Sequence, residues 1–401
     1  MKKLKKKQKL LLSKFLTSSF LILFGFILSF TFFKTNVQTL NFLPSISNSV
    51  AAINSKDLIK KLENKNFTLI NVHTPYEGEI EKTDIFINYD EILASKDKLP
   101  QDKNAEIVLY CKTGRMSTEA AATLLNLGYT DVKHLNGGMD AWKKEGGSLI
   151  DLSKLPEQVL PQEGFTLPVS WGSLGPRLIQ LGVIDQAKFE KVVKMDNTQK
   201  EILTKGSDSL ITINTQNSQF VVDMLWAVGL GQKSLVYDEG PMGKEYKNKA
   251  GNFASTGVWS LAKGSAMAHY NKHDLISLTA EQHKRVMDIA GHVYRPCCGN
   301  HTAFPDCNHG MAALAAIEMM VSLNMSDESI YKSVLELNSF WFGSTYMTTA
   351  TYFARQGISW DKVDAKEVLG AKYSSGQGAA EIAKKVNPLP YESKSGGGCG
   401  A

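Results

Sequence analysis

Apolar residues in the first part of the chain come either in short continuous runs or at helical spacing. Two runs, "FTLINV" and "EIVLYC", are rich in β-branched residues and are typical of buried strands. The predicted elements are, in chain order, a helix at 55–64 with Ser55 as its cap, strands at 67–72 and 106–111, a helix at 117–129 closed by Gly128, a strand at 132–135 and a helix around 139–146. Strands and helices that alternate at this distance predict a parallel α/β sheet.

The pattern changes after a Pro- and Gly-rich stretch from Leu155 to Gly175. Beyond it, apolar residues recur at a helical period in five segments, and few stretches resemble strands. These segments are 176–193, 218–230, 280–294, 310–323 and 328–342. The second part of the chain is therefore predicted to be mostly α-helical.

At 401 residues the chain is long enough for two domains that each bury their own core. The predicted division is a lysine-rich cytoplasmic segment and transmembrane anchor at 1–34, a stalk at 35–52, an α/β domain at 53–149, a linker at 150–175, a helical domain at 176–389 and a flexible Gly/Cys tail at 390–401.

The N-terminus combines a cluster of lysines with a long apolar run. The first fourteen residues hold seven lysines and no acidic residue, and residues 15–33 hold no charge. A helix of this length is about as long as the hydrocarbon core of a bilayer is thick. Since basic residues stay on the cytoplasmic side, we expect a single-pass protein of the cell membrane with both domains outside the cytoplasm. The alternative is secretion after cleavage of a signal peptide near 49–52, although this site lies far beyond the apolar run.

The distribution of charge argues against nucleic-acid recognition. The formal net charge is +5, but the N-terminal segment alone holds seven lysines, so the remaining residues together carry a net charge of −2. A domain that binds nucleic acid needs a basic face. We therefore expect no nucleic-acid partner.

Cys111 has the setting of a reactive cysteine. It ends a predicted strand, and the segment Tyr110–Ser117 ("YCKTGRMS") leads from it into a predicted helix. Open α/β sheets place ligands at this point, where backbone N–H groups converge on an anion. The helix dipole, Lys112 and Arg115 should together favour the thiolate form. The alternative is a buried cysteine at a strand end without a chemical role.

Residues 53–147 resemble a rhodanese domain. The resemblance rests on the strand, cysteine, loop and helix of "LYCKTGRMSTEAA" and on "LGYTDVKHLNGGMDAWKKEG", which matches the Gly-Gly-x-x-x-Trp ending of the family. It implies a sulfurtransferase in which Cys111 carries a sulfane sulfur as a persulfide, held by the loop amides, and passes it to a thiol or another nucleophile. The loop residues are Lys112, Thr113, Gly114, Arg115, Met116 and Ser117.

Two segments depart from the family pattern, and a further position excludes a related activity. Met116 stands where the family often has a basic residue, so Arg115 would have to supply the charge. Asn-Val-His at 71–73 stands where the family commonly has Asp-Val-Arg, a change expected to affect the support of the loop more than its chemistry. Related phosphatases and arsenate reductases have C-x5-R. The sixth residue after Cys111 is Ser117, so the arginine that would clamp a phosphate is absent.

A second group of cysteines and histidines lies in "RPCCGNHTAFPDCNHG". Cys298-x-x-His301 and Cys307-x-His309 could each supply two ligands to a tetrahedral zinc site, and soft ligands of this kind also suit copper. Cys297 is a further candidate ligand. Because it is adjacent to Cys298, the two side chains point apart unless the loop folds back.

Thiol chemistry and a purely structural role are the alternatives to a metal site. Outside the membrane, Cys297 or Cys298 could form a disulfide with Cys307, and the start of the following predicted helix should make Cys307 more reactive. In the structural alternative, the cysteines pack as small apolar residues and the histidines cap helices. His269 and His273 are four residues apart and could join the site, although a separate surface pair is the commoner case.

One function is preferred over two alternatives. We expect a membrane-anchored, extracytoplasmic sulfurtransferase that takes sulfur from a donor such as thiosulfate or a persulfide and passes it through Cys111 to a protein or small-molecule thiol. Cysteines of the helical domain would exchange sulfur with Cys111. Cys399, in a Gly-rich end, would be a mobile carrier between the two sites unless that end has no role. The alternatives are a thiophilic metal-binding or metal-delivery protein with a degenerate rhodanese docking domain, and a thiol-disulfide oxidoreductase.

Overall fold

The computed structural model of the protein describes residues 50–386 and 389. In this part of the chain, no helix is both long and apolar enough to cross a membrane. The predicted anchor at 15–33, most of the predicted stalk and the tail with Cys399 lie outside the described residues.

The first part of the described chain is a parallel α/β domain, as predicted. Its elements are β1 (Ala51–Ile53), α2 (Ser55–Glu63), β2 (Thr68–Asn71), β3 (Glu79–Ile80), β4 (Ile85–Phe86), η1 (Lys96–Lys98), β5 (Ile107–Tyr110), α3 (Arg115–Asn126), β6 (Val132–Leu135), α4 (Gly138–Lys144) and β7 (Leu149–Ile150). Five strands form one sheet in the order β1-β6-β5-β2-β4, and every neighbouring pair is parallel. Outside this sheet, β3 pairs antiparallel with β7.

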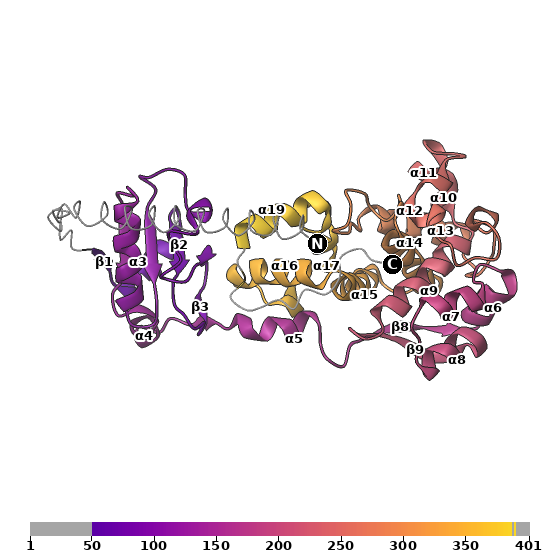
Figure 1. Ribbon diagram of the computed structural model, residues 1–401, viewed down its shortest axis with the longest axis horizontal. Helices are drawn as coiled ribbons and strands as arrows, with labels where there is room; N and C mark the ends of the chain where they lie inside the picture. Colours follow the sequence, from indigo (N-terminus) through magenta and orange to yellow (C-terminus); the bar gives the residue numbers. More distant parts are fainter. Residues whose placement is uncertain (1–49, 387–388, 390–401) are drawn as a thin grey trace, which may run out of the picture. The chain divides into compact units, whose positions relative to one another are not determined.

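The central strand β5 is buried on both faces, because helices pack on each side of the sheet (Figure 1). Ile107 and Leu109 point to a core that includes residues of α3. Val108 and Tyr110 point to a second core that includes residues of α2 and α4. Successive side chains of a strand face opposite sides, so a continuous apolar run is what a strand covered on both faces requires. The carboxyl end of β5, where Cys111 follows, is thereby held from two sides.

The start of this domain differs in detail from the prediction. β1 begins at Ala51, inside the predicted stalk, and pairs with β6. Asn54, rather than Ser55, caps α2, since its side chain accepts a hydrogen bond from the N–H of Asp57. Asparagine and serine are equally good caps, so the side chain that points at the open N–H groups decides between them.

The remaining described residues are mostly helical, as predicted. Their elements are η2 (Leu152–Lys154), α5 (Leu155–Val159), β8 (Phe165–Gly172), α6 (Leu174–Leu181), α7 (Gln186–Val192), α8 (Asn197–Lys205), β9 (Ser207–Ile213), α9 (Ser218–Gly231), α10 (Leu235–Glu239), α11 (Pro241–Lys244), η3 (Ala250–Asn252), α12 (Ala254–Gly257), η4 (Ala266–Ala268), α13 (Ala280–Gly291), α14 (Asn308–Ser322), α15 (Asp327–Trp341), α16 (Gly343–Arg355), η5 (Trp360–Lys362), α17 (Ala365–Leu369), α18 (Ala371–Ser374) and α19 (Gly376–Val386).

The segment expected to be a linker, 150–175, contains ordered elements. It holds α5 and the strand β8, which pairs antiparallel with β9. Leu167, Val169 and Trp171 are buried and alternate with more exposed residues, the pattern of a strand with one buried face. The many Pro and Gly residues around this alternation concealed it. The predicted helix at 176–193 is also divided, into α6 and α7, because the chain turns at Gly182 with φ of +82°.

Two buried helices, α9 and α14, form the centre of the helical part and pack closely together. A Cβ atom placed on Gly229 of α9 would lie 2.4 Å from the carbonyl oxygen of Met311 in α14, so only glycine allows this approach. α13 and α15 also pack against α14 (Figure 1). These contacts fix the N-terminus of α14, which Cys307 caps.

A buried ion pair joins the α/β domain to α16. Arg355 Nε lies 2.7 Å from Glu79 Oε2, and a second guanidinium nitrogen lies 2.8 Å from Oε1. The side chains are 3% and 0% exposed. Burial disfavours the charge of Arg355, but the Glu79 carboxylate outweighs it and raises the pKa of the guanidinium.

Candidate functional site

Cys111 lies between β5 and α3, as predicted. The residues that follow it form a loop around its sulfur. Sγ is 3.1 Å from the backbone nitrogen of Gly114 and 3.4 Å from that of Ser117, whose Oγ is 3.6 Å away. Gly114 has φ of +104°, a conformation that favours glycine. Thr113 is exposed, and Met116 packs against the core beside α3. Two amides at the start of a helix thus point at one sulfur, which favours an anion there.

The Gly-Gly pair before α4 lets that helix approach the loop. Gly138 has φ of +56°, and a Cβ atom there would lie 2.1 Å from the carbonyl oxygen of Cys111. The N–H of Met139 donates to the same oxygen at 2.9 Å. The sequence motif therefore has a steric role: it holds the backbone of Cys111 in place.

The two cationic side chains of the loop form ion pairs with carboxylates. Lys112 Nζ lies 2.7 Å from Glu77, and Arg115 lies 2.6 Å from Glu119. The cation side chains are 46% and 60% exposed. The hydrogen bond that Lys112 donates to Glu77 raises the pKa of Lys112. In this arrangement the direct partners of the Cys111 sulfur are the loop amides and the Ser117 hydroxyl, and Lys112 and Arg115 add charge at the rim.

Asn71, one of the departures from the family pattern, supports the neighbouring chain. It is fully buried, its Nδ2 donates to the carbonyl oxygen of Gly78 at 3.0 Å, and its Oδ1 accepts from the N–H of His73. His73 is buried too, and its Nε2 lies 3.5 Å from Glu77 Oε1. Both positions therefore have structural roles, in keeping with the expectation that they matter for support.

The loop before α14 folds back on itself and gathers three sulfurs, here called the cysteine cluster (Cys297, Cys298 and Cys307). Cys297 Sγ lies 3.5 Å from Cys307 Sγ. Cys298 Sγ lies 3.8 Å from Asp306 Oδ1, and it belongs to a group with Asp306 and Cys307 whose polar atoms all lie within 4.8 Å of one another. All three cysteines are half-buried free thiols. A bridge between Tyr294 and His301 closes the loop, so adjacent cysteines can reach the same partner.

A buried arginine holds the cluster together. Arg295 is 0% exposed, and its Nε donates to Cys307 Sγ at 3.0 Å. Its other nitrogens bind Asp306 Oδ1 at 2.7 Å and the carbonyl oxygens of Asn300 and Phe304. Arg295 and Asp306 were not among the site residues predicted from the sequence. The available signal was a charged residue directly before Pro-Cys-Cys, but sequence alone does not show that this residue is buried.

The three sulfurs are electrostatically unequal. Cys307 caps α14, and the N–H of Gly310 donates to its Sγ at 3.4 Å. Hydrogen bonds from Cys297 and Cys298, followed by the charge of Arg295, hold the pKa of Cys307 well below its usual range. Hydrogen bonds with Cys298 and Cys307, followed by burial, raise the pKa of Cys297. Negative charge is thus stabilised best on Cys307 and less well on Cys297.

The predicted metal ligands do not converge as one set of four. Within the described residues, Cys297, Cys307 and His309 form one group with ligand atoms within 4.8 Å of one another, and Cys298 joins the other group with Asp306 and Cys307. His301 belongs to neither group, and its ring lies against Tyr294 at 5.8 Å between centroids.

His269 and His273 contact each other rather than the cysteine cluster. Their Nδ1 and Nε2 atoms lie 3.3 Å apart, and His269 Nε2 lies 3.1 Å from the carbonyl oxygen of Lys263. Burial, followed by the neighbouring His269, lowers the pKa of His273. The pair is therefore a local structural contact.

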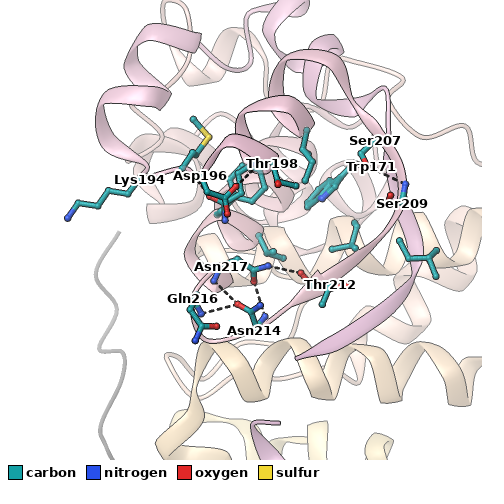
Figure 2. Close-up of a pocket in the computed structure, with 17 residues that line it drawn as sticks. Trp171, Lys194, Asp196, Thr198, Ser207, Ser209, Thr212, Asn214, Gln216 and Asn217 are labelled. Atoms are coloured by element: carbon teal, nitrogen blue, oxygen red, sulfur yellow. Dashed lines mark hydrogen bonds between the residues drawn. The ribbon is translucent and has the colours of Figure 1, made fainter. Parts of the chain in front are cut away.

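A pocket of ≈ 610 Å³ lies between β9, α8 and the start of α9 (Figure 2). Several of its polar side chains form hydrogen bonds within turns and helix caps. Asp196 caps α8, and Asn217 Nδ2 donates to the carbonyl oxygen of Thr212. Asn214 Oδ1 accepts a hydrogen bond from the N–H of Asn217. Lys194 points away from the pocket (Figure 2). No cysteine or histidine is among its lining residues. The sulfur sites are therefore the stronger candidates for chemistry.

Comparison with known proteins places the similarity in the α/β domain. Residues 54–145 match the family model described as a rhodanese-like domain. Over 88 residues the chain is 43% identical to a probable adenylyltransferase/sulfurtransferase MoeZ of Mycobacterium tuberculosis, covering 20% of this chain and 21% of that protein. Over 105 residues it is 31% identical to a sulfurtransferase of Allochromatium vinosum, covering 25% of this chain and 95% of that protein. A solved rhodanese-like domain protein of Staphylococcus aureus is 26% identical, covers 25% of this chain and 100% of its own, and has a TM-score of 0.23.

Proposed function

Because the chain belongs, through residues 54–145, to the rhodanese-like family, we propose that it is a sulfurtransferase in which Cys111 carries sulfane sulfur as a persulfide. The observation that carries this proposal is the pair of amides, from Gly114 and Ser117, directed at the Cys111 sulfur. Both relatives named above are called sulfurtransferases, but the chain spans only about a fifth of the MoeZ protein. The donor and acceptor are therefore part of the proposal.

The transfer has two displacement steps. With thiosulfate as donor, the Cys111 thiolate attacks the sulfane sulfur, the new S–S bond forms, and sulfite leaves with the electron pair of the broken bond. The loop amides stabilise the negative charge of the persulfide. An acceptor thiolate then attacks the outer sulfur and releases Cys111 as a thiolate. Thiols of the helical domain, or of a separate protein or small molecule, serve as acceptors.

Mass spectrometry of the full-length protein tests the role of Cys111. After thiosulfate treatment, the peptide that contains Cys111 should gain the mass of one sulfur atom, and sulfite should appear in equal amount. Sulfate, which has no sulfane sulfur, is the matched control and should give no adduct. Cys111→Ser should abolish both products, since a hydroxyl cannot form a persulfide. Sulfite release that is unchanged in Cys111→Ser would contradict the assignment.

We also propose that the protein is anchored in the cell membrane with its domains outside the cytoplasm. The lysine cluster and the uncharged run at 15–33 support this topology. Protease added to intact cells should digest both domains, and protection of both would contradict it. Cys399 as a mobile sulfur carrier remains a prediction, because it lies outside the described residues.

Metal binding at the helical part is the competing function. The close approach of Cys297, Cys307 and His309 supports it. Arg295 opposes it, because its buried guanidinium already binds the Cys307 sulfur and would repel a divalent cation at the same atom. Metal analysis of purified protein beside a count of free thiols separates the two: bound zinc or copper with few free thiols favours the metal function.

A further inference from the structure

The cysteine cluster places two thiols where a disulfide can form. Cys297 Sγ and Cys307 Sγ are 3.5 Å apart, whereas a disulfide bond is about 2.05 Å long. Both residues are partly exposed and are free thiols. A movement of roughly 1.5 Å therefore separates the dithiol from the disulfide. The loop that carries Cys297 also lies outside regular helices and strands, so such a movement disturbs no helix.

Arg295 and the start of α14 stabilise negative charge on one of these sulfurs. The guanidinium of Arg295 is excluded from water, so its attraction for Cys307 Sγ at 3.0 Å is little screened. The N–H of Gly310 adds a second donor. A Cβ atom on Gly310 would lie 2.5 Å from the guanidinium carbon, so glycine is needed for Arg295 to fit. These two donors would stabilise the negative charge of a thiolate or of a persulfide on Cys307.

His309 is placed to receive a proton from the pair. One of its ring nitrogens lies within 4.8 Å of both Cys297 Sγ and Cys307 Sγ. Its Nδ1 is buried and has no hydrogen-bond partner among the described residues. In this group of three side chains, the imidazole is the base that can take the proton of the Cys297 thiol.

We propose that the cysteine cluster is a second reactive site, which reduces sulfane sulfur to hydrosulfide. The Cys307 thiolate attacks the outer sulfur of a persulfide, R–S–SH. The S–S bond of the donor breaks, R–S⁻ leaves, and Cys307 becomes a persulfide. Cys297 then passes its proton to His309 and attacks Cys307 Sγ. The Cys297–Cys307 disulfide forms as the outer S–S bond breaks, and HS⁻ leaves with its electron pair.

This sequence balances without an added oxidant. Two cysteine sulfurs lose two electrons in forming the disulfide, and the sulfane sulfur gains both as it becomes hydrosulfide. The products are R–S⁻, HS⁻, the disulfide and a proton on His309. An external dithiol reduces the disulfide and restores the cluster for another turnover. The inference rests on the proposed function only for the source of the sulfur, since any soluble persulfide can enter the cycle.

Cys298 has a different environment from the reacting pair. Its Sγ contacts Asp306 Oδ1 at 3.8 Å and the carbonyl oxygen of Asn300 at 3.9 Å, both of which are acceptors. These partners hold the sulfur as a thiol. The structure therefore assigns Cys297 as the resolving thiol and Cys307 as the sulfur acceptor.

The test uses the full-length chain with Cys111→Ser and Cys399→Ser, which leaves only the three cysteines of the cluster. The reduced protein is mixed with glutathione persulfide, and hydrosulfide, intact mass and disulfide-linked peptides are measured in a single turnover. The parent should release one hydrosulfide per chain, lose the mass of two hydrogens and yield a Cys297–Cys307 peptide. Cys297→Ser should stop at a persulfide on Cys307 and release no hydrosulfide. Cys307→Ser should give neither product.

A matched pair of arginine variants tests the hydrogen bond that Arg295 donates to the Cys307 sulfur. Arg295→Lys should slow formation of the persulfide about tenfold or more, since it loses a charge-assisted hydrogen bond to sulfur. Arg285 of α13 binds Asp327 and none of the cluster, so Arg285→Lys should react like the parent. Circular dichroism checks folding, and if Arg295→Lys does not fold, the cysteine variants still decide the matter.

Two results would overturn the inference: hydrosulfide release by Cys297→Ser at the parent rate, or a parent that keeps its persulfide and forms no Cys297–Cys307 disulfide. Failure of thiosulfate loading at Cys111 would instead refute the proposed function. The two failures are distinguishable, because Cys111 is absent from every protein in this experiment.

Discussion

Arg355→Met should strongly destabilise the protein, because it leaves Glu79 buried without its counter-charge. Both oxygens of Glu79 bind the guanidinium, at 2.7 and 2.8 Å, and the carboxylate is 0% exposed. Arg355 also donates to the carbonyl oxygen of Val386 at 3.0 Å, so the substitution frees a second buried acceptor. The Glu79 carboxylate cannot turn to water without opening the contact between the α/β domain and α16.

The loss in the free energy of unfolding can be estimated because Glu79 and Arg355 form a buried ion pair. Removing one partner of a buried, bidentate ion pair typically costs about 3–5 kcal/mol. Removing both is far milder, because no uncompensated charge remains. The double variant Glu79→Met/Arg355→Met should therefore recover most of the loss. The exposed pair of Glu201 and Lys205, with side chains 63% and 70% exposed, is the control, and Glu201→Gln should change stability by less than about 1 kcal/mol.

Thermal unfolding followed by circular dichroism and tryptophan fluorescence measures these differences. For domains of this size, 1 kcal/mol shifts Tm by about 2–4 °C, so Arg355→Met should lower the transition by roughly 10 °C. Two probes are needed, since a chain of this length need not unfold in one step. If Arg355→Met shifts Tm no more than Glu201→Gln does, or if the double variant is as unstable as Arg355→Met, the pair does not hold the two parts together as argued.

Two further predictions concern a glycine and a buried acid. Gly138→Ala should lose most thiosulfate loading, because its Cβ would meet the carbonyl oxygen of Cys111. Gly146→Ala shares the positive φ, with no atom within 4 Å of its Cβ, and should keep loading despite a cost in stability of about 1 kcal/mol. Burial raises the pKa of Glu318 to about 8, so between about pH 4.5 and 8 the folded carboxyl keeps a proton that the unfolded one loses. Glu318 should thus lower stability by about 1.4 kcal/mol per pH unit in this range, and the slope from urea unfolding should be smaller by about this amount in Glu318→Gln.

Much of the α/β domain could be predicted because its signals are local. The runs around β2 and β5 are continuous and apolar, as strands covered on both faces must be, and the Gly-Gly pair at 137–138 marks the approach of α4 to the loop. The β8 strand was missed although Leu167, Val169 and Trp171 alternate as a half-buried strand requires. Its partner β9 is distant in sequence, and no local pattern shows which segments pair.

The two sulfur sites differ in how far sequence could define them. The setting of Cys111 is local, since the amides that surround it come from the six residues that follow. The cysteine cluster depends on a loop that folds back, so spacing suggested a tetrahedral set with His301, which the structure places elsewhere. Arg295 decides the chemistry of the cluster through its burial, and burial depends on the packing of the whole helical part.

Both sulfurs accept a hydrogen bond from a backbone N–H group of the same kind. The two sites differ in whether a second thiol lies beside the sulfur. Cys111 and Cys307 each accept the N–H of a glycine three residues later, at 3.1 and 3.4 Å. Within the described residues, the hydrogen-bond partners of Cys111 Sγ include no cysteine, so under the proposed function a persulfide there lasts until an external thiol arrives. At Cys307, the Cys297 thiol 3.5 Å away would attack the persulfide and release its outer sulfur as hydrosulfide. The lifetime of the persulfide at each site thus follows from the position of Cys297, and moving a resolving thiol beside Cys111 should convert a carrier of sulfur into a site that reduces it.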